Sequence, residues 1–226
     1  MDTALPGRRV GPLETPTRFA FHAAPACMLV YGVVRVFDGR DGQYGPGLAW
    51  TVGHVFFLAA LLLLGVVIAG LYRTVPTGGR AGRAAAAVAA VVGLAGLLTF
   101  VRVAVVDIVV GLRAADATEK RALARLYADA PDVLPKLLYD IGPLFFELGL
   151  FALLLHLALG RPQRVSWWSL ALIAFGFLAI TVELDLLPVA AALIWLGMAS
   201  IDGTARRRGP SGTSAGTPTA RSSSPG

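Results

Sequence analysis

The sequence predicts an all-α, polytopic membrane helix bundle. Apolar residues make up 56% of the 226 positions and only 15% are charged, well under the quarter that is typical of soluble domains. The apolar residues are also gathered in runs of about 20, the length that a helix needs to cross a bilayer. We therefore expect the chain to reside in the plasma membrane, with the lipid bilayer as its main surroundings.

Six segments read as transmembrane helices, at about residues 19–37, 48–72, 84–110, 137–159, 167–182 and 186–201. The last two are short, but a single helix over both would be about 52 Å long, more than one crossing requires. Residues 183–188 supply a break, with Asp185 as a helix cap and Pro188 in the first turn of the next helix. Both two full spans and a re-entrant hairpin fit residues 167–201.

Three polar segments flank or interrupt this transmembrane domain of residues 19–203. Residues 1–18 form an N-terminal segment, and residues 204–226, which are rich in Ser, Thr, Gly and Pro, are expected to be a disordered tail. The loop 113–136 contains good helix formers over 117–128, with an apolar stripe at Leu123 and at 126–127. That pattern predicts a short helix at the membrane surface.

The distribution of arginine predicts the orientation. With six spans, one side of the membrane receives both ends of the chain and the loops near residues 73–83 and 160–166. This side carries twelve arginines against three acidic residues. The other side carries basic and acidic residues in similar numbers. Because cytoplasmic loops are enriched in Lys and Arg, both termini are predicted to be cytoplasmic.

The composition also excludes some classes of partner and cofactor. The net charge of +6 is spread over short loops, so no basic face for nucleic acid is expected. Cys27 is the only cysteine, which excludes an intramolecular disulfide and a thiolate-rich metal centre. His22 and His156 are predicted near the cytoplasmic ends of their spans, far from His54 in depth, so we expect no metal and no cofactor.

Two charged residues lie deep in predicted spans. Arg102 is eleven residues before Arg113, and Glu147 is eleven residues after Lys136. Each is thus about 16 Å from its flanking charge, near the middle of the bilayer, where an ionisable group costs roughly 2.5–3.5 kcal/mol. Because the two spans are consecutive and antiparallel, we expect an Arg102–Glu147 ion pair.

A shallower layer completes the candidate polar cluster of Arg102, Glu147, Asp107, Asp140 and His54. Asp140 is seven residues before Glu147 and faces the same side of the helix, and His54 is a candidate partner for Asp107. One interpretation is a buried polar knot that holds three helices in register. The other is an outward-facing polar pocket between the second, third and fourth spans. The Gly142-Pro143 dipeptide fits a helix break at the pocket, and it also fits simple packing of a kinked helix.

Several short motifs resemble those of small, uncharacterised multi-pass membrane proteins of high-GC bacteria. They are Gly53-His54 early in a span, the long outer loop, Gly142-Pro143 in the fourth span, and the terminal hairpin with Leu187-Pro188 and Trp195-Leu196-Gly197. The resemblance covers residues 19–203. It implies a helical membrane fold and brings no assigned activity.

These observations favour a non-enzymatic membrane protein with a structural, regulatory or partner-binding role, in contact with a protein partner or a second copy of itself. The alternative is a small transporter or sensor that uses the outer pocket. An intramembrane enzyme is the weakest hypothesis, because the sequence contains no paired-glutamate peptidase motif, no HExxH and no serine with a base at matching depth. No small-molecule ligand follows from the sequence.

Overall fold

The computed structural model describes residues 14–42, 44–76, 79–129, 136–160 and 165–207, with the backbone alone at 41, 128–129, 136–140 and 206–207. In these residues the regular secondary structure is entirely helical. It forms α1 (Thr15–Asp38), η1 (Gly39–Asp41), α2 (Leu48–Arg73), α3 (Arg80–Arg113), α4 (Ala117–Asp129), α5 (Lys136–Leu159), α6 (Trp167–Val182), η2 (Leu184–Leu186) and α7 (Leu187–Arg207).

The predicted helices are confirmed, with small differences at their ends. Five are long and apolar enough to cross a membrane: α1, α2, α3, α5, and α7 together with the residues of η2. The sixth, α6, is also apolar but has only 16 residues, about 24 Å. Helix α7 continues to Arg207, so the predicted tail begins inside a helix. The rest of that tail lies outside the described residues.

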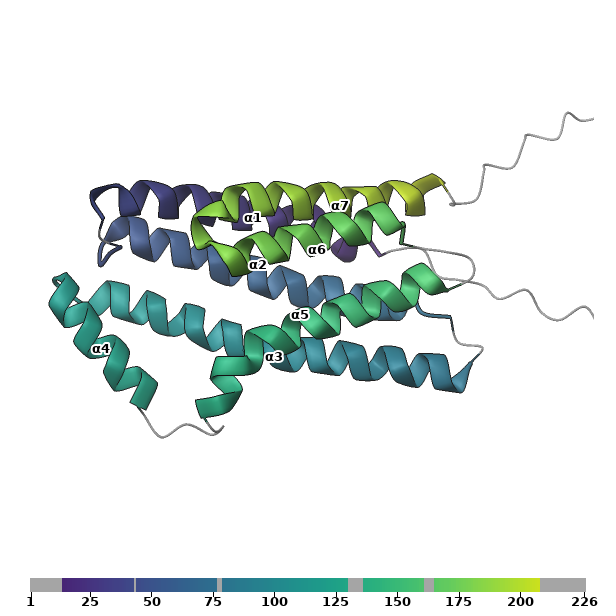
Figure 1. Cartoon of the computed structure of the whole chain (residues 1–226), viewed down its shortest axis with the longest axis horizontal. Helices are drawn as coiled ribbons and strands as arrows, with labels where there is room; N and C mark the ends of the chain where they lie inside the picture. The colour runs from purple at the N-terminus through teal and green to yellow at the C-terminus, as the bar shows by residue number, and fades with distance from the viewer. Residues whose placement is uncertain (1–13, 43, 77–78, 130–135, 161–164, 208–226) are drawn as a thin grey trace, which may run out of the picture.

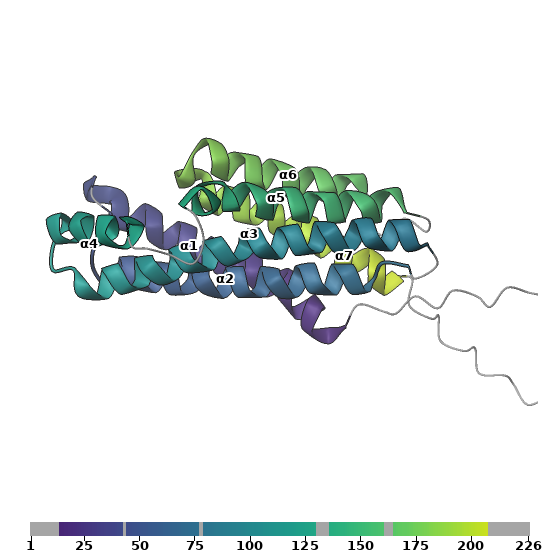
Figure 2. The ribbon, with the colours of Figure 1, turned by 90° about the horizontal axis from the view of Figure 1, so that it is seen from below.

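The long helices run roughly parallel or antiparallel to one another (Figures 1 and 2). Side by side, they follow the order α5, α3, α2, α1, α7 and α6, and α5 makes only slight contact with α6. One continuous core joins them, with fully buried side chains that include Phe21, Leu64, Ile68, Phe146, Leu150 and Ile194. The helices are apolar on their outer faces as well, where large side chains such as Leu62, Leu98 and Phe175 are exposed, a pattern typical of helices surrounded by lipid.

The bundle has two chemically different ends. At the arginine-rich end, α1, α3 and α6 begin, and α2, α5 and α7 finish; Arg18 and Arg73 lie here, paired with Asp202 and Glu14. The loop end carries residues 39–47, the turn between α6 and α7, and α4, which is steeply inclined to the long helices (Figure 1). The first and last described helices therefore bring their outer termini to the same end.

The break between α6 and α7 is confirmed, although its cap differs from the prediction. Glu183 is extended, and its side chain accepts a hydrogen bond from the backbone N–H of Asp185 at 3.5 Å. Glu183, rather than Asp185, therefore caps the connecting turn. Pro188 is the second residue of α7, where its missing N–H costs no helical hydrogen bond.

Glycines bring α3 and α5 into close contact. Gly93 faces Gly149, and Gly142 faces the side chain of Thr99. Helix α5 continues without interruption through Pro143, so Gly142-Pro143 marks a packing contact and not a break that exposes backbone carbonyls. These paired glycines fix the register of the two antiparallel helices.

Candidate functional site

His54 and Asp107 form the centre of a polar site at the loop end. His54 lies in the second turn of α2 and is 5% exposed, and Asp107 lies about two turns before the end of α3. The two helices pack against each other in antiparallel fashion, so these positions meet. The Nε2 atom of His54 is 3.4 Å from Oδ2 of Asp107, and the contact suggested by the sequence is therefore present.

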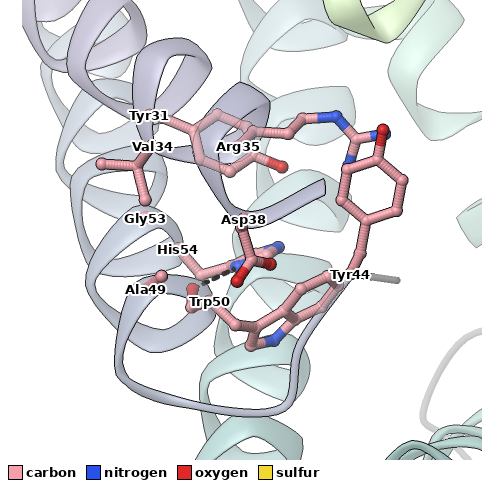
Figure 3. A pocket seen from close by; sticks show the side chains of 9 residues that line it. All are labelled: Tyr31, Val34, Arg35, Asp38, Tyr44, Ala49, Trp50, Gly53 and His54. Carbon is pink, nitrogen blue, oxygen red and sulfur yellow. Dashed lines mark hydrogen bonds between the residues drawn. The ribbon is translucent and has the colours of Figure 1, made fainter. Parts of the chain in front are cut away.

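The hydrogen bonding of His54 fixes the position of its first proton. Its Nδ1 atom is 2.8 Å from the carbonyl oxygen of Trp50, one turn earlier in α2, a bond drawn in Figure 3. A carbonyl can only accept, so Nδ1 carries the proton. Nε2 then offers Asp107 either a lone pair or, in the imidazolium form, an N–H. The contact is attractive when the pair holds one further proton.

Trp50 links three elements around this pair. Its ring centroid is 4.1 Å from that of His54, and its Nε1–H donates to the backbone carbonyl of Asp107 at 2.9 Å. The Nζ atom of Lys120, from α4, lies 3.5 Å from the centroid of the indole ring. A cation over an aromatic face is attracted by the ring's negative charge density, so Trp50 holds α4 beside the His54–Asp107 pair.

A small pocket opens to solvent next to His54 (Figure 3). It is shallow, with room for about one water molecule. Side chains of α1, of the loop 39–47 and of α2 line it, among them Tyr31, Arg35, Asp38, Tyr44 and Trp50. The sequence hypothesis placed a pocket between the second, third and fourth spans, whereas this one lies between the first two.

Arg35 and Tyr44 connect the pocket to the turn between α6 and α7. The guanidinium of Arg35 lies over the Tyr44 ring, 4.1 Å from its centroid, and its Nε is 3.5 Å from Oδ1 of Asp185. The Tyr44 hydroxyl donates to the same oxygen at 3.1 Å, which raises the pKa of Tyr44 because ionisation would remove the donor. The loop thus ties α1 to the terminal hairpin.

Helix α4 docks on the bundle through one face. Lys120 and Tyr127 lie on the docked face, and Lys120 donates to the backbone carbonyl of Tyr44. Partial burial lowers the pKa of Lys120, because desolvation disfavours its charged form. At the other end, Arg113 donates to the Tyr127 hydroxyl at 2.7 Å. The predicted surface helix is therefore present and is held mainly by cationic groups.

The start of α4 is capped by its own sequence. Asp116 Oδ1 accepts from the backbone N–H groups of Thr118 and Glu119, each at 2.8 Å. These two bonds lower the pKa of Asp116 by stabilising its ionised form. Glu119 in turn accepts from the backbone N–H of Ala115 at 2.8 Å, an arrangement close to a capping box.

The predicted Arg102–Glu147 ion pair is wrong. Among the described residues no ion pair joins these two side chains, and Arg102 donates to the backbone carbonyl of Tyr127 at 3.1 Å. Carbonyls in the last turn of a helix lack partners within the helix, and a cation there is also favoured by the helix dipole. Arg102 is thus a cap for the end of α4.

The register of α3 and α5 explains this error. Because Gly93 faces Gly149 and Thr99 faces Gly142, Arg102 is level with about position 139 of α5. Glu147 is then roughly 12 Å farther from the loop end than Arg102. The sequence estimate assumed that Arg113 and Lys136 lie at equal height. In the structure α3 instead extends about two turns beyond the start of α5, where α4 packs on it.

The predicted cluster is therefore divided. His54 and Asp107 meet, Arg102 binds α4, and Glu147 lies apart on α5, partly buried. The side chain of Asp140 is outside those that the structure describes. Within the described part of the chain, no group of three or more His, Cys, Asp or Glu residues could hold a metal ion.

A second polar group, at the arginine-rich end, was missed by the sequence analysis. Asp202, 2% exposed, accepts from Nε of Arg18 at 2.8 Å and lies 3.6 Å from Nε2 of His22. The indole N–H of Trp195 donates to Nδ1 of His22 at 3.1 Å. Both ring nitrogens of His22 are thus engaged, so the group joins α1 to α7 and offers no free base.

Aromatic rings fill the core below the pocket. Tyr31 lies 5.2 Å from His54 and 4.9 Å from Phe57, and a series of edge contacts continues through Phe100 and Phe146 to Phe177. Such contacts favour offset or perpendicular rings at these distances. In this conformation the polar site is therefore separated from the arginine-rich end by packed apolar side chains.

The site thus combines a histidine–carboxylate pair that can bind protons with the docked helix α4, and among the described residues it presents no nucleophile activated by a base. Comparison with known proteins gives no family for the chain: no protein-family model matches it, and neither a curated protein nor a solved structure matches it significantly.

Proposed function

We propose that the chain is a six-span integral membrane protein of the plasma membrane, with both termini in the cytoplasm and a non-enzymatic, regulatory role exercised at its loop end. The observation that carries this proposal is the docking of α4 on the bundle, where Lys120 lies over Trp50 beside the His54–Asp107 pair and Arg102 and Arg113 bind Tyr127. A helix held by a few polar contacts can be released by a signal or a partner at modest cost.

The distribution of charge supports the orientation. The arginine-rich end carries Arg18, Arg73, Arg80 and Arg83 on helices that begin or finish there. These arginines lie close to helix termini, where the positive-inside rule applies. The loop end then faces the exterior, and α4 is exposed to solutes and proteins outside the cell.

Cysteine labelling tests this orientation in intact cells. In a Cys27→Ala background, single cysteines replace Arg125, exposed on α4, and Gly79, exposed between α2 and α3. A membrane-impermeant maleimide should label position 125 in intact cells and position 79 only after permeabilisation. Labelling of position 79 in intact cells, with position 125 protected, would reverse the proposed topology.

A second candidate function is a small transporter or sensor that uses the outer pocket. The pocket favours it, because it opens to solvent and is lined by Arg35, Asp38 and His54. The packed aromatic rings below His54 support a sensor over a transporter. Either a solute or a proton would then act from outside, without crossing the core in this conformation.

A further inference from the structure

We propose that the His54–Asp107 pair is a proton-binding site, and that its protonation state controls whether α4 stays docked. This inference deepens the proposed function and rests on its orientation only for the compartment whose pH is read. The ligand is the proton, supplied by solvent through the adjoining pocket. The responding element is α4, attached through Lys120.

The proton-binding pair and the side chain that attaches α4 lie close together. The ammonium of Lys120 lies 3.5 Å from the centroid of the Trp50 ring, and that ring lies 4.1 Å from His54. Lys120 is therefore within about 8 Å of the imidazole, close enough for their charges to interact in a partly buried site. Asp107, the partner of His54, is the one acidic residue of α3, and its negative charge favours the charged form of Lys120.

Electrostatic interaction couples proton binding by the His54–Asp107 pair to the docking of α4. With one proton shared, the pair is neutral overall, and Asp107 remains available to attract Lys120. A second proton leaves a protonated His54 beside a neutral Asp107, so the site becomes positive and opposes Lys120. Because coupling between two binding events is reciprocal, whatever disfavours the second proton when α4 is docked must also disfavour docking once that proton is bound.

The surrounding groups do not replace this pair. On α1, Arg35 lies over Tyr44 and near Asp185, and Asp38 accepts from the backbone N–H of Gly45 at 2.9 Å. Tyr31 contacts His54 through its ring edge. From α4 the charged group is Lys120. The acid in contact with the His54 ring is thus Asp107, and the cation that responds to it is Lys120.

The test is a distance measurement on the purified full chain in lipid nanodiscs. In a Cys27→Ala background, spin labels are placed at Leu48, 82% exposed at the start of α2, and at Arg125, exposed on α4. Electron–electron resonance distances are recorded between about pH 5 and 8, the range in which histidine side chains titrate. We expect one narrow distance at pH 8 and a longer, broader one at pH 5.

Single substitutions show which side chains cause the change in distance with pH. His54→Gln should keep the narrow distance at both pH values, because it removes the group that becomes positive. Asp107→Asn removes the acid that attracts Lys120 and leaves a histidine that can still become positive, so it should give a broader distance than the wild type already at pH 8. Lys120→Ala should give the broad distance throughout. His22→Gln, at the opposite end of the bundle, is the matched control and should retain the full response. Gel filtration and thermal unfolding confirm that each variant is folded.

Two results would overturn the proposal. One is a wild-type distance that stays the same from pH 8 to pH 5. The other is a full response in the folded His54→Gln protein. Because the experiment uses purified protein, its failure is distinguishable from a reversed topology, which only the labelling of intact cells reports.

Discussion

The contact between Gly93 and Gly149 sets the distance between α3 and α5, and it makes a specific prediction for stability. A Cβ atom at position 149 would meet backbone atoms of Gly93 and the carbonyl oxygen of Ala89. Backbone atoms cannot rotate away as a side-chain tip can, so Gly149→Ala must push the two helices apart. Overpacking of this kind costs about 1–3 kcal/mol.

A second effect opposes this cost. Alanine is favoured over glycine inside a helix by roughly 0.5–1 kcal/mol, so we expect Gly149→Ala to lower the free energy of unfolding by about 1–2 kcal/mol in total. Gly203→Ala is the matched control, because a Cβ at position 203 of α7 meets nothing within 4 Å. Only the favourable helix term applies there, and stability should stay the same or rise.

The assay is unfolding of the purified protein in mild detergent by added dodecyl sulfate, followed by far-ultraviolet circular dichroism. The wild-type chain, Gly149→Ala and Gly203→Ala are compared, with Gly149→Val as a larger perturbation that should cost more than alanine. If Gly149→Ala were as stable as Gly203→Ala, the close approach of α3 and α5 would be refuted.

Three further outcomes follow from the polar groups. Asp202→Ala should cost about 1.5–3 kcal/mol of stability because it removes a buried charged hydrogen-bond acceptor; in the same unfolding assay Glu14→Ala, which breaks an exposed pair, should cost less than about 1 kcal/mol. Glu147→Gln should leave the unfolding midpoint unchanged or higher, since no ion pair with Arg102 is lost. A clear drop in the midpoint would be evidence that the two side chains do form an ion pair. Because the pKa of Asp116 is lowered in the folded chain, its capping contribution is complete above the unfolded value of about 3.9 and is lost as pH falls through the lower folded value. Asp116→Ala should raise amide exchange in α4 at neutral pH, whereas Asp116→Asn, which also caps, should change it little.

The sequence predicted helix identity better than helix register. Apolar runs define where helices such as α2 and α6 begin and end, because charged or capping residues bound them on both sides. The height of α3 relative to α5 depends instead on paired glycines and on how far α4 folds back over α3. Neither the glycine contacts nor the position of α4 can be deduced from the length of a single segment, so Arg102 and Glu147 were placed at equal depth.

The site was predicted in the same partial way. His54 and Asp107 stood out as ionisable residues in apolar helices, and His54 was one candidate partner for Asp107. The contact between Trp50 and Lys120 was not predicted, because it depends on the docking angle of α4. The bond between His22 and Trp195 joins residues 173 positions apart, a separation that local patterns do not report.

The most direct test of the central claim, a wet polar site at the loop end above a dry core, is the water accessibility of two positions. In a Cys27→Ala background, single cysteines replace Ala49, which lines the pocket, and Glu147, in the middle of α5. A charged methanethiosulfonate reagent is then added from outside, and the labelling rates are compared. We expect rapid labelling at position 49 and none at position 147. Equal rates at the two positions would mean that water reaches the centre of the bundle, which would contradict a core closed to water.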